Sequence, residues 1–259
     1  MEKIYVYGKD SRSTKLKYLY SLENKIVEKV EEAKLVICPM PLTRDNEYIT
    51  SEEIKIDELF SKIRGKKLYT GGISKEVELK CIENNIQYID MLKIEEVTIM
   101  NAIPSAEGAI QIAMEMTDFT LHESNCLILG YGNIGKVLAR ILTGLGANVF
   151  CEARSEKDLA NIKSMRYNCI RLEELSRNLN KMNVIFNTVP SIILDEKKLR
   201  LINKNCTIID LASKPGGIDL DKAKELNLNT VWALGLPGKV APYTAAKYLK
   251  DTIDKNKEM

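Results

Sequence analysis

Short apolar runs alternate with charged, helix-like segments along the first hundred residues of the chain. The runs at residues 4–7, 35–38 and 67–70 have the length of buried strands, and each is followed by Gly or Pro. Residues 25–32 and 56–63 lie between these runs and place apolar side chains at helical spacing. The alternation predicts a small α/β domain over residues 1–100, in which helices cover the faces of a parallel sheet.

The pattern changes near residue 100, where Pro104 precedes a stretch of small and apolar residues. A proline suits the first turn of a helix, because the backbone N–H groups there have no helical partner. We therefore predict a helix that starts at Pro104 and carries Ser105 and Glu107 near its beginning. Small side chains allow close packing against a ligand or a neighbouring domain, and the same spacing is equally compatible with a linker helix.

The second half of the chain contains a glycine-rich turn in a specific setting. A strand-like run at residues 126–129 leads into Gly130, Gly132 and Gly135, spaced as G-x-G-x-x-G, and a helical stretch follows at 136–145. In this setting the glycines permit a tight turn, close approach of a pyrophosphate and close packing of helix on strand. With a second strand at 148–152, the pattern predicts a doubly wound, dinucleotide-binding Rossmann domain over residues 101–241.

The end of that second strand decides which dinucleotide is expected. If residues 149, 151 and 153 share one face, Ala153 stands where NAD-binding domains place an acidic residue, and Glu152 points to the other face. Arg154 and Ser155 then stand where a 2′-phosphate would lie, and a guanidinium with a hydroxyl suits that group. This register favours NADP. A shift of one residue would put Glu152 in the acidic position and favour NAD.

Three later strands end in turns that should face the same crevice, because ligands bind at the carboxyl ends of parallel strands. These turns are residues 187–190, 210–217 and 233–239, and Gly and Pro recur in them. We expect them to form the substrate and nicotinamide site. The predicted dinucleotide-binding residues are Gly130, Gly132, Asn133, Ile134, Gly135, Arg154, Ser155, Asn187, Thr188, Val189, Pro190, Gly235, Leu236 and Pro237.

The only histidine, His122, precedes the strand at 126–129 and should lie at the end of that strand opposite the crevice. We interpret it as structural or interdomain. Asp210, Lys214, Lys239 and Glu107 are then the candidates for proton transfer. A charged residue beside Pro and Gly is also typical of a solvated turn.

The amino-acid composition argues against several classes of protein. The chain has 259 residues, 45% hydrophobic and 29% charged, which fits two globular domains. Its 38 Lys+Arg and 36 Asp+Glu residues give a net charge of +2, which does not indicate a nucleic-acid or membrane partner. No apolar run approaches the about 18 residues of a membrane helix, and the first residues lack a signal-peptide pattern, so we expect a cytoplasmic protein. One histidine and six scattered cysteines predict no metal site and no disulfide framework.

Several segments together resemble one known family. Residues 103–110, the glycine turn, residues 153–155, the run Asp-Leu-Ala-Ser-Lys-Pro-Gly-Gly at 210–217 and residues 235–242 are similar to the A subunits of dipicolinate synthases. The resemblance covers most of the chain from about residue 98. The N-terminal third matches less well, because Gly8 and Lys9 replace a double glycine that is usual in the family.

The resemblance implies a fold and an activity. Such A subunits resemble D-2-hydroxyacid dehydrogenases, with a smaller flavodoxin-like N-terminal domain to which a C-terminal helix, here residues 242–259, returns. They aromatise a reduced dipicolinate precursor, on a branch from lysine biosynthesis during sporulation, with hydride transfer to NADP. They act in a hetero-oligomer with a smaller, flavoprotein-like B subunit. The two substrate carboxylates need polar or cationic partners, for which the candidates are Arg12, Thr43, Arg44, Ser105, Ser213 and Lys239.

Lys214 is the first choice for acid/base chemistry or for anchoring a carboxylate, with Asp210 and Glu107 as the other catalytic candidates. Two alternatives stay open at this stage. The chain could be another NADP-dependent oxidoreductase of similar fold, acting on a shikimate-like or 2-oxo acid substrate. It could also be a dinucleotide sensor that binds without turnover.

Overall fold

The computed structural model describes residues 3–50 and 52–257, and these form two compact units. The first unit contains residues 1–101 and 237–259, and the second contains residues 102–236. Met1, Glu2 and the last two residues of the predicted C-terminal helix lie outside the described part. No helix in that part is long and apolar enough to cross a membrane.

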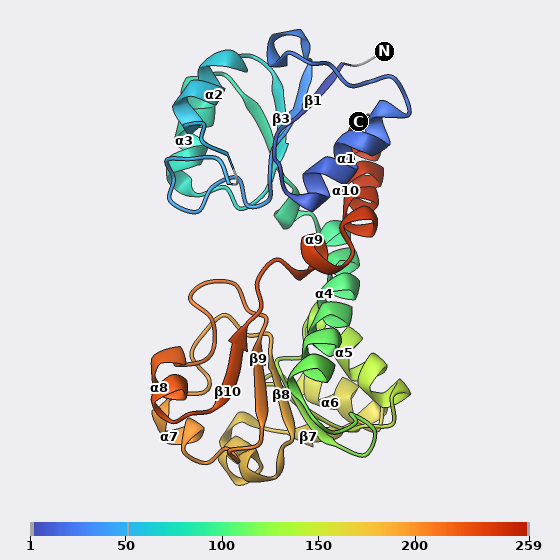
Figure 1. Ribbon diagram of the computed structural model, residues 1–259, viewed down its shortest axis with the longest axis vertical. Helices are drawn as coiled ribbons and strands as arrows, with labels where there is room; N and C mark the ends of the chain where they lie inside the picture. Colours follow the sequence, from blue (N-terminus) through green and yellow to red (C-terminus); the bar gives the residue numbers. More distant parts are fainter. Residues whose placement is uncertain (1–2, 51, 258–259) are drawn as a thin grey trace. The chain divides into compact units, whose positions relative to one another are not determined.

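The first unit is built on a parallel sheet of four strands in the order β1-β2-β3-β4. Strands β1 and β3 are labelled in Figure 1. Its strands are β1 (Ile4–Val6), β2 (Leu35–Ile37), β3 (Lys67–Thr70) and β4 (Gln87–Asp90). Its helices are α1 (Ser11–Ser21), α2 (Ile56–Lys62), α3 (Lys75–Glu83) and α10 (Pro242–Lys257), with 3₁₀ turns at Val30–Glu32 and Met91–Lys93. The predicted strands and the helix at 56–63 are thereby confirmed.

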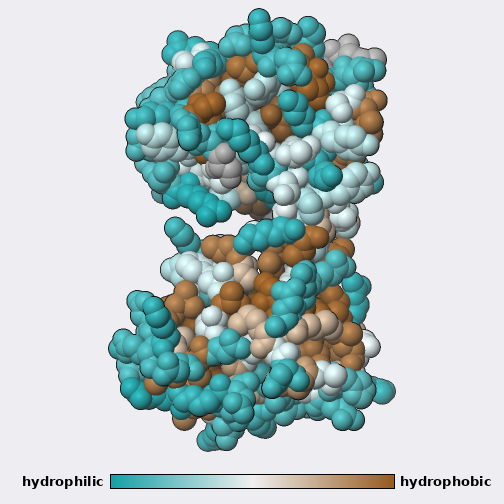
Figure 2. Space-filling model, viewed as in Figure 1, coloured by the Kyte–Doolittle hydropathy of each residue, from teal (hydrophilic) through white to brown (hydrophobic). Residues whose placement is uncertain are grey.

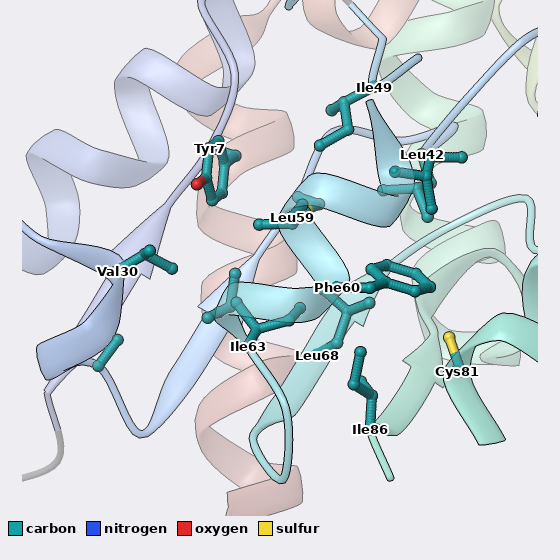
Figure 3. Close-up of a cluster of buried hydrophobic side chains, with 14 of the residues drawn as sticks. Tyr7, Val30, Leu42, Ile49, Leu59, Phe60, Ile63, Leu68, Cys81 and Ile86 are labelled. Carbon is teal, nitrogen blue, oxygen red and sulfur yellow. The ribbon is translucent and has the colours of Figure 1, made fainter. Parts of the chain in front are cut away.

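Two apolar clusters cover the two faces of this sheet. Leu59 and Phe60 of α2 and Cys81 of α3 pack on one face, as Figure 3 shows. Leu16 of α1 and Leu249 of α10 pack in the cluster on the other face. The C-terminal helix therefore returns to the first unit, and its long contact with α1 joins segments more than 220 residues apart in sequence.

The helix predicted at residues 25–32 is wrong. Ile26 is extended and bridges Ile4 in parallel, with backbone bonds from Ile4 N to Lys25 O and from Val27 N to Ile4 O. Apolar spacing could not separate helix from edge strand in so short a run. With Ile26 beside β1, the chain order across the sheet is that of flavodoxin-like folds. The helix instead lies at α1, where Asp10 caps the N–H groups of Arg12 and Ser13.

The second unit is a six-stranded, all-parallel sheet in the order β10-β9-β8-β5-β6-β7. The strands are β5 (Asn125–Leu129), β6 (Asn148–Glu152), β7 (Asn168–Ile170), β8 (Val184–Asn187), β9 (Thr207–Asp210) and β10 (Asn229–Trp232). The helices are α5 (Asn133–Gly144), α6 (Glu156–Ser164), α7 (Glu196–Leu199) and α8 (Leu220–Glu225), with 3₁₀ turns at Leu172–Arg177 and Leu179–Lys181. Helices α5 and α6 lie on one side of the sheet and α7 and α8 on the other, which is the predicted doubly wound arrangement (Figure 1).

Two helices include the positions where one unit ends and the other begins. Helix α4 (Glu95–Met116) contains the change at residues 101 and 102, and the short α9 (Leu236–Val240) contains the change at 236 and 237. Pro104 lies inside α4, so the predicted helix start at Pro104 is wrong. The helix continues through the proline because Ala102, Ala106 and Ala109 keep one face buried, and this packing outweighs one lost backbone hydrogen bond.

The cysteines behave mostly as core residues. Five of the six are buried, Cys169 is partly exposed, and all six are free thiols. Burial raises the pKa of the Cys126 thiol to about 11, which disfavours a reactive thiolate. Hydrophilic side chains cover most of the face drawn in Figure 2, with apolar side chains visible between them in each unit.

Candidate functional site

The predicted loops of the second unit lie on one edge of its sheet. The strand order reverses between β5 and β8, whose carboxyl ends are Leu129 and Asn187. Strand β9 continues on the same side and ends at Asp210, beside Asn187. This is the switch point at which doubly wound folds bind their ligands.

The glycine turn is tightly packed against its neighbours. Gly130 has a φ of +88°, and a Cβ there would lie 2.6 Å from Val189 Cγ2 and 2.7 Å from Thr188 Oγ1. A Cβ at Gly135 would lie 2.2 Å from Gly130 O. Two of the three glycines are therefore required by space, and the turn contacts the end of β8.

The third glycine, Gly132, faces open space and is the N-cap of α5 without a side-chain cap. No side chain accepts from the first N–H groups of this 12-residue helix, and a helix N-terminus attracts phosphate groups. Tyr131, within the turn, is buried, with Lys136 Nζ 5.7 Å from its ring centroid. The open position at Gly132 and the uncapped helix fit the pyrophosphate of a dinucleotide.

The strand register at β6 places Glu152 and Ala153 on opposite faces, as expected. Phe150 and Glu152 pair with Leu127 and Leu129, and Phe150 packs in the same apolar cluster as those two leucines. Sequence reasoning missed where the Glu152 carboxylate goes. Glu152 is 1% exposed, and Gly130 N–H donates to both its backbone oxygen and its Oε2, each over 3.2 Å.

The two residues proposed for a 2′-phosphate differ in their availability. Arg154 is exposed and forms no ion pair with the described residues. Ser155 is the N-cap of α6, and its Oγ accepts from Asp158 N over 3.1 Å and donates to Asp158 Oδ2 over 2.7 Å. The Ser155 hydroxyl caps the helix, so Arg154 is the more available of the two groups for a phosphate.

The surroundings of Asp210 favour a structural role over the predicted proton transfer. It is completely buried, and its carboxylate accepts from Ala212 N over 3.0 Å, Gly217 N over 2.9 Å and Asn187 Nδ2 over 2.7 Å. Asn187 is equally buried and also donates to Val189 O over 3.0 Å. Both side chains therefore hold the loops at the site in place.

The loop that Asp210 organises presents Ser213 and Lys214 to solvent. A Cβ at Gly217 would lie 2.5 Å from Val189 O, so this loop also contacts the end of β8. Trp232 at the end of β10 supports it by donating from Nε1 to Ala212 O over 2.8 Å. The turns after β5, β8 and β9 are thus joined, and Lys214 is an exposed cation on a loop held firmly at its base.

The remaining predicted dinucleotide contacts are spread along the same loops. Thr188 Oγ1 donates to Leu129 O over 2.9 Å, while Pro190 is exposed. After β10, Gly235 has a φ of +70° and Leu236 is buried at the start of α9. Asn133 is exposed on the first turn of α5, and Ile134 beside it is half-buried. Pro237 is half-buried and belongs to the first unit.

Glu107 and Ser105 lie in the interior of α4 rather than at a helix start. Glu107 is exposed and Ser105 is half-buried. Because a mid-helix position offers no free backbone N–H groups, these residues could act only through their side chains.

In the first unit the structure brings Arg12 close to α9, since a Cβ at Gly238 would lie 3.7 Å from Arg12 Cβ. Arg12 Nη2 donates to Met40 O over 2.7 Å, its only side-chain hydrogen bond to the described residues, and burial lowers the pKa of its guanidinium. Lys239 on α9 and Arg44 are exposed. Most of the donors of Arg12 thus remain for a ligand.

Thr43, predicted to bind the substrate, lies in a turn whose hydrogen bonds its hydroxyl completes. It is buried, its Oγ1 donates to Asp45 Oδ1 over 3.0 Å, and it accepts from Asn46 N over 3.0 Å. Threonine hydroxyls bond to nearby backbone in turns of this kind, which is a local role that the sequence analysis did not weigh.

His122 lies at the end of β5 opposite Gly130, as predicted. A Cβ at Gly146 would lie 2.5 Å from its ring, and Gly146 precedes β6. Among the described residues, no three His, Cys, Asp or Glu side chains are arranged to hold a metal ion.

Comparison with known proteins gives this geometry a family context. Residues 2–92 match the model of the N-terminal domain of dipicolinate synthase A subunits, so the resemblance includes the N-terminal third as well. The chain is thus related to the A subunits of dipicolinate synthases. Residues 103–214 match the NAD-binding domain of D-isomer specific 2-hydroxyacid dehydrogenases, so the second unit is a nicotinamide-dinucleotide-binding domain of dehydrogenase type.

Individual relatives agree with the family models. The dipicolinate synthase A subunit of Bacillus subtilis (strain 168) is 37% identical over 188 residues, which are 73% of this chain and 63% of that protein. The match thus spans less than two thirds of that relative. The crystal structure of the dipicolinate synthase A subunit from Bacillus halodurans has a TM-score of 0.89 and 26% identity, covering 98% of this chain and 97% of that one. The corresponding crystal structure from Bacillus subtilis has a TM-score of 0.85 and 27% identity, covering 98% and 95%.

Proposed function

We propose that the chain is an NADP-dependent oxidoreductase that aromatises a dihydrodipicolinate-type precursor to dipicolinate. The observation that carries the proposal is the meeting of three turns at the switch point, with the uncapped α5 beside them and Arg154 exposed at the end of β6. The substrate class comes from the relatives, which are named as dipicolinate synthase A subunits.

Within the second unit, the first turn of α5 and Gly132 hold the pyrophosphate, and Arg154 holds the 2′-phosphate. When bound, the nicotinamide supplies a hydride acceptor. The substrate ring loses a hydride from one carbon and a proton from a neighbouring atom, and these two steps leave an aromatic ring. Lys214, exposed on its fixed loop, takes that proton or holds a substrate carboxylate.

Substrate carboxylates need cations with free donors. Arg12 is the best candidate for this role in the first unit. Burial holds its side chain in place, and the bond to Met40 O uses only one of its five N–H donors. Lys239, on the helix that approaches Arg12, and the exposed Arg44 are further candidates. Ser213, next to Lys214, offers a hydroxyl in the second unit.

The test is a coupled assay. Aspartate semialdehyde and pyruvate, with the synthase of the lysine pathway, generate the precursor in place, and the chain is added with NADP or NAD. NADPH and dipicolinate absorbance are followed together. Dipicolinate formation with NADP supports the reaction and the cofactor. NADPH binding without product, even with a B subunit present, would refute the substrate and favour a dinucleotide sensor.

The relatives carry the name of an A subunit, which supports a partner. We propose that this chain acts in the cytoplasm during sporulation, in a hetero-oligomer with a flavoprotein-like B subunit. Co-expression of the two chains followed by size-exclusion chromatography tests the complex. Separate elution, together with full turnover by this chain alone, would argue against it.

A further inference from the structure

The Glu152 carboxyl is buried under the turn that is proposed to hold the dinucleotide. Its Oε2 accepts from Gly130 N over 3.2 Å, while its Oε1 is buried without a hydrogen-bond partner. An ionised carboxylate with one unpartnered oxygen is costly in such a place, whereas the neutral acid costs less. The position therefore favours the protonated form.

The groups around Glu152 are few. Its strand neighbours are Leu129 on one side and Ile170 on the other, and both are buried and apolar. Two charged residues face it, the exposed Arg154 and, on the 3₁₀ turn after β7, Glu173. Burial raises the pKa of the Glu152 carboxyl, Glu173 raises it further, and the Gly130 N–H and Arg154 lower it.

Arg154 links this carboxyl to the dinucleotide. In the free protein its charge stabilises an ionised Glu152. A bound 2′-phosphate uses the same guanidinium and brings up to two negative charges to the end of β6. Both changes disfavour a carboxylate at Glu152.

We propose that NADP binding is coupled to protonation of Glu152, so that the neutral acid selects NADP and ionisation of Glu152 shifts the preference toward NAD. The inference rests on the proposed dinucleotide site. NAD carries a 2′-hydroxyl in place of the phosphate. NAD binding should therefore take up a smaller fraction of a proton than NADP binding. Glu152 is thus a positioning and specificity residue, acting through the turn and Arg154.

Isothermal titration calorimetry of the full chain tests the coupling. NADPH and NADH are titrated between pH 6 and 9 in two buffers of different ionisation enthalpy, which gives the number of protons exchanged. Wild type should take up a fraction of a proton with NADPH, and the NADPH Kd should rise by up to about tenfold per pH unit above the pKa of Glu152. The 2′-phosphate itself, with a second pKa of about 6, would release a proton on pairing with Arg154, so its contribution has the opposite sign.

Two variants decide between the outcomes. Glu152→Gln should bind NADPH without this proton uptake and keep its NADPH preference at all pH values, because the amide is isosteric and does not ionise. Glu173→Gln is the matched control, and it should keep the uptake with its midpoint moved to lower pH. Uptake that persists in Glu152→Gln, or NADPH binding by wild type without uptake, overturns the inference and leaves the proposed function standing. Failure of wild type to bind either dinucleotide overturns both.

Discussion

The side-chain amide of Asn187 donates to the carboxylate of Asp210 over 2.7 Å, and both residues are completely buried at the ends of adjacent strands. Each also bonds to backbone of the loop that follows its strand. One buried polar pair therefore fixes two of the three turns at the candidate site. Polar residues at a strand end look catalytic in a sequence, while here they build the frame that holds exposed groups.

Loss of Asp210 should be costly to stability. Asp210→Ala leaves the N–H groups of Ala212 and Gly217 and the Asn187 amide buried without an acceptor, which should lower the free energy of unfolding by about 3 kcal/mol or more. Urea denaturation measures it. Asp219→Ala, which removes the N-cap of α8, is the control and should cost about 1 kcal/mol. An equal loss in both variants would contradict the role of Asp210.

Two glycines of α5 give a matched pair. Gly135→Ala would place a Cβ 2.2 Å from Gly130 O, so the turn must shift, and we expect lower stability and NADPH binding weaker by about tenfold or more. Gly144→Ala meets no atom within 4 Å and should stabilise by about 0.5–1 kcal/mol without changing binding. Thermal denaturation and fluorescence titration measure both. Equal NADPH affinity in the two variants would mean that the turn does not bind the dinucleotide.

Arg154 should discriminate between the two nicotinamide dinucleotides. Arg154→Gln removes the exposed cation at the end of β6, and we expect the NADPH Kd to rise by about tenfold or more while the NADH Kd changes little. Lys157→Gln, an exposed cation on the first turn of α6, is the control and should change neither. A parallel loss of NADPH and NADH affinity would show that Arg154 does not contact a 2′-phosphate.

Lys214 should affect turnover rather than cofactor affinity. Lys214→Met keeps the length of the side chain and removes its charge, so we expect turnover in the coupled assay to fall by about 100-fold or more with nearly unchanged NADPH Kd. The pH profile of Lys214→Arg separates the roles, since an arginine can hold a carboxylate and does not exchange a proton. Unchanged turnover in Lys214→Met would remove this residue from the mechanism.

Glu152 should make stability depend on pH. Burial raises the pKa of this carboxyl above its unfolded value of about 4.3, so its stabilising contribution is fully present below that value and is lost as pH rises through the folded pKa. The Tm of Glu152→Gln should therefore exceed that of wild type by more at pH 8 than at pH 5. Glu173→Gln keeps the carboxyl of Glu152 and removes one charge that raises its pKa, so the difference from wild type should widen by less than in Glu152→Gln. A constant difference between Glu152→Gln and wild type would mean that Glu152 does not ionise in this range.

Local patterns in the sequence determined most strands of both sheets and the glycine turn with its helix. These features depend on short apolar runs, on the period of apolar residues and on glycine, and each of these acts within a few neighbouring residues. The register at Glu152 and Ala153 followed from strand alternation in the same way. Strands β4 and β7 have no such clear pattern, and the returning C-terminal helix followed from the family resemblance.

Tertiary structure decided what those local signals leave open. Residues 25–27 join the sheet edge because Ile4 offers free backbone groups there, and α4 runs through Pro104 because its alanine face is buried. Asp210, Thr43 and Ser155 carry polar groups of the kind that a site needs, yet neighbours in the fold take up their hydrogen bonds. A sequence shows which residues could do chemistry, and only the packed structure shows which of them still have donors, acceptors or charge to spare.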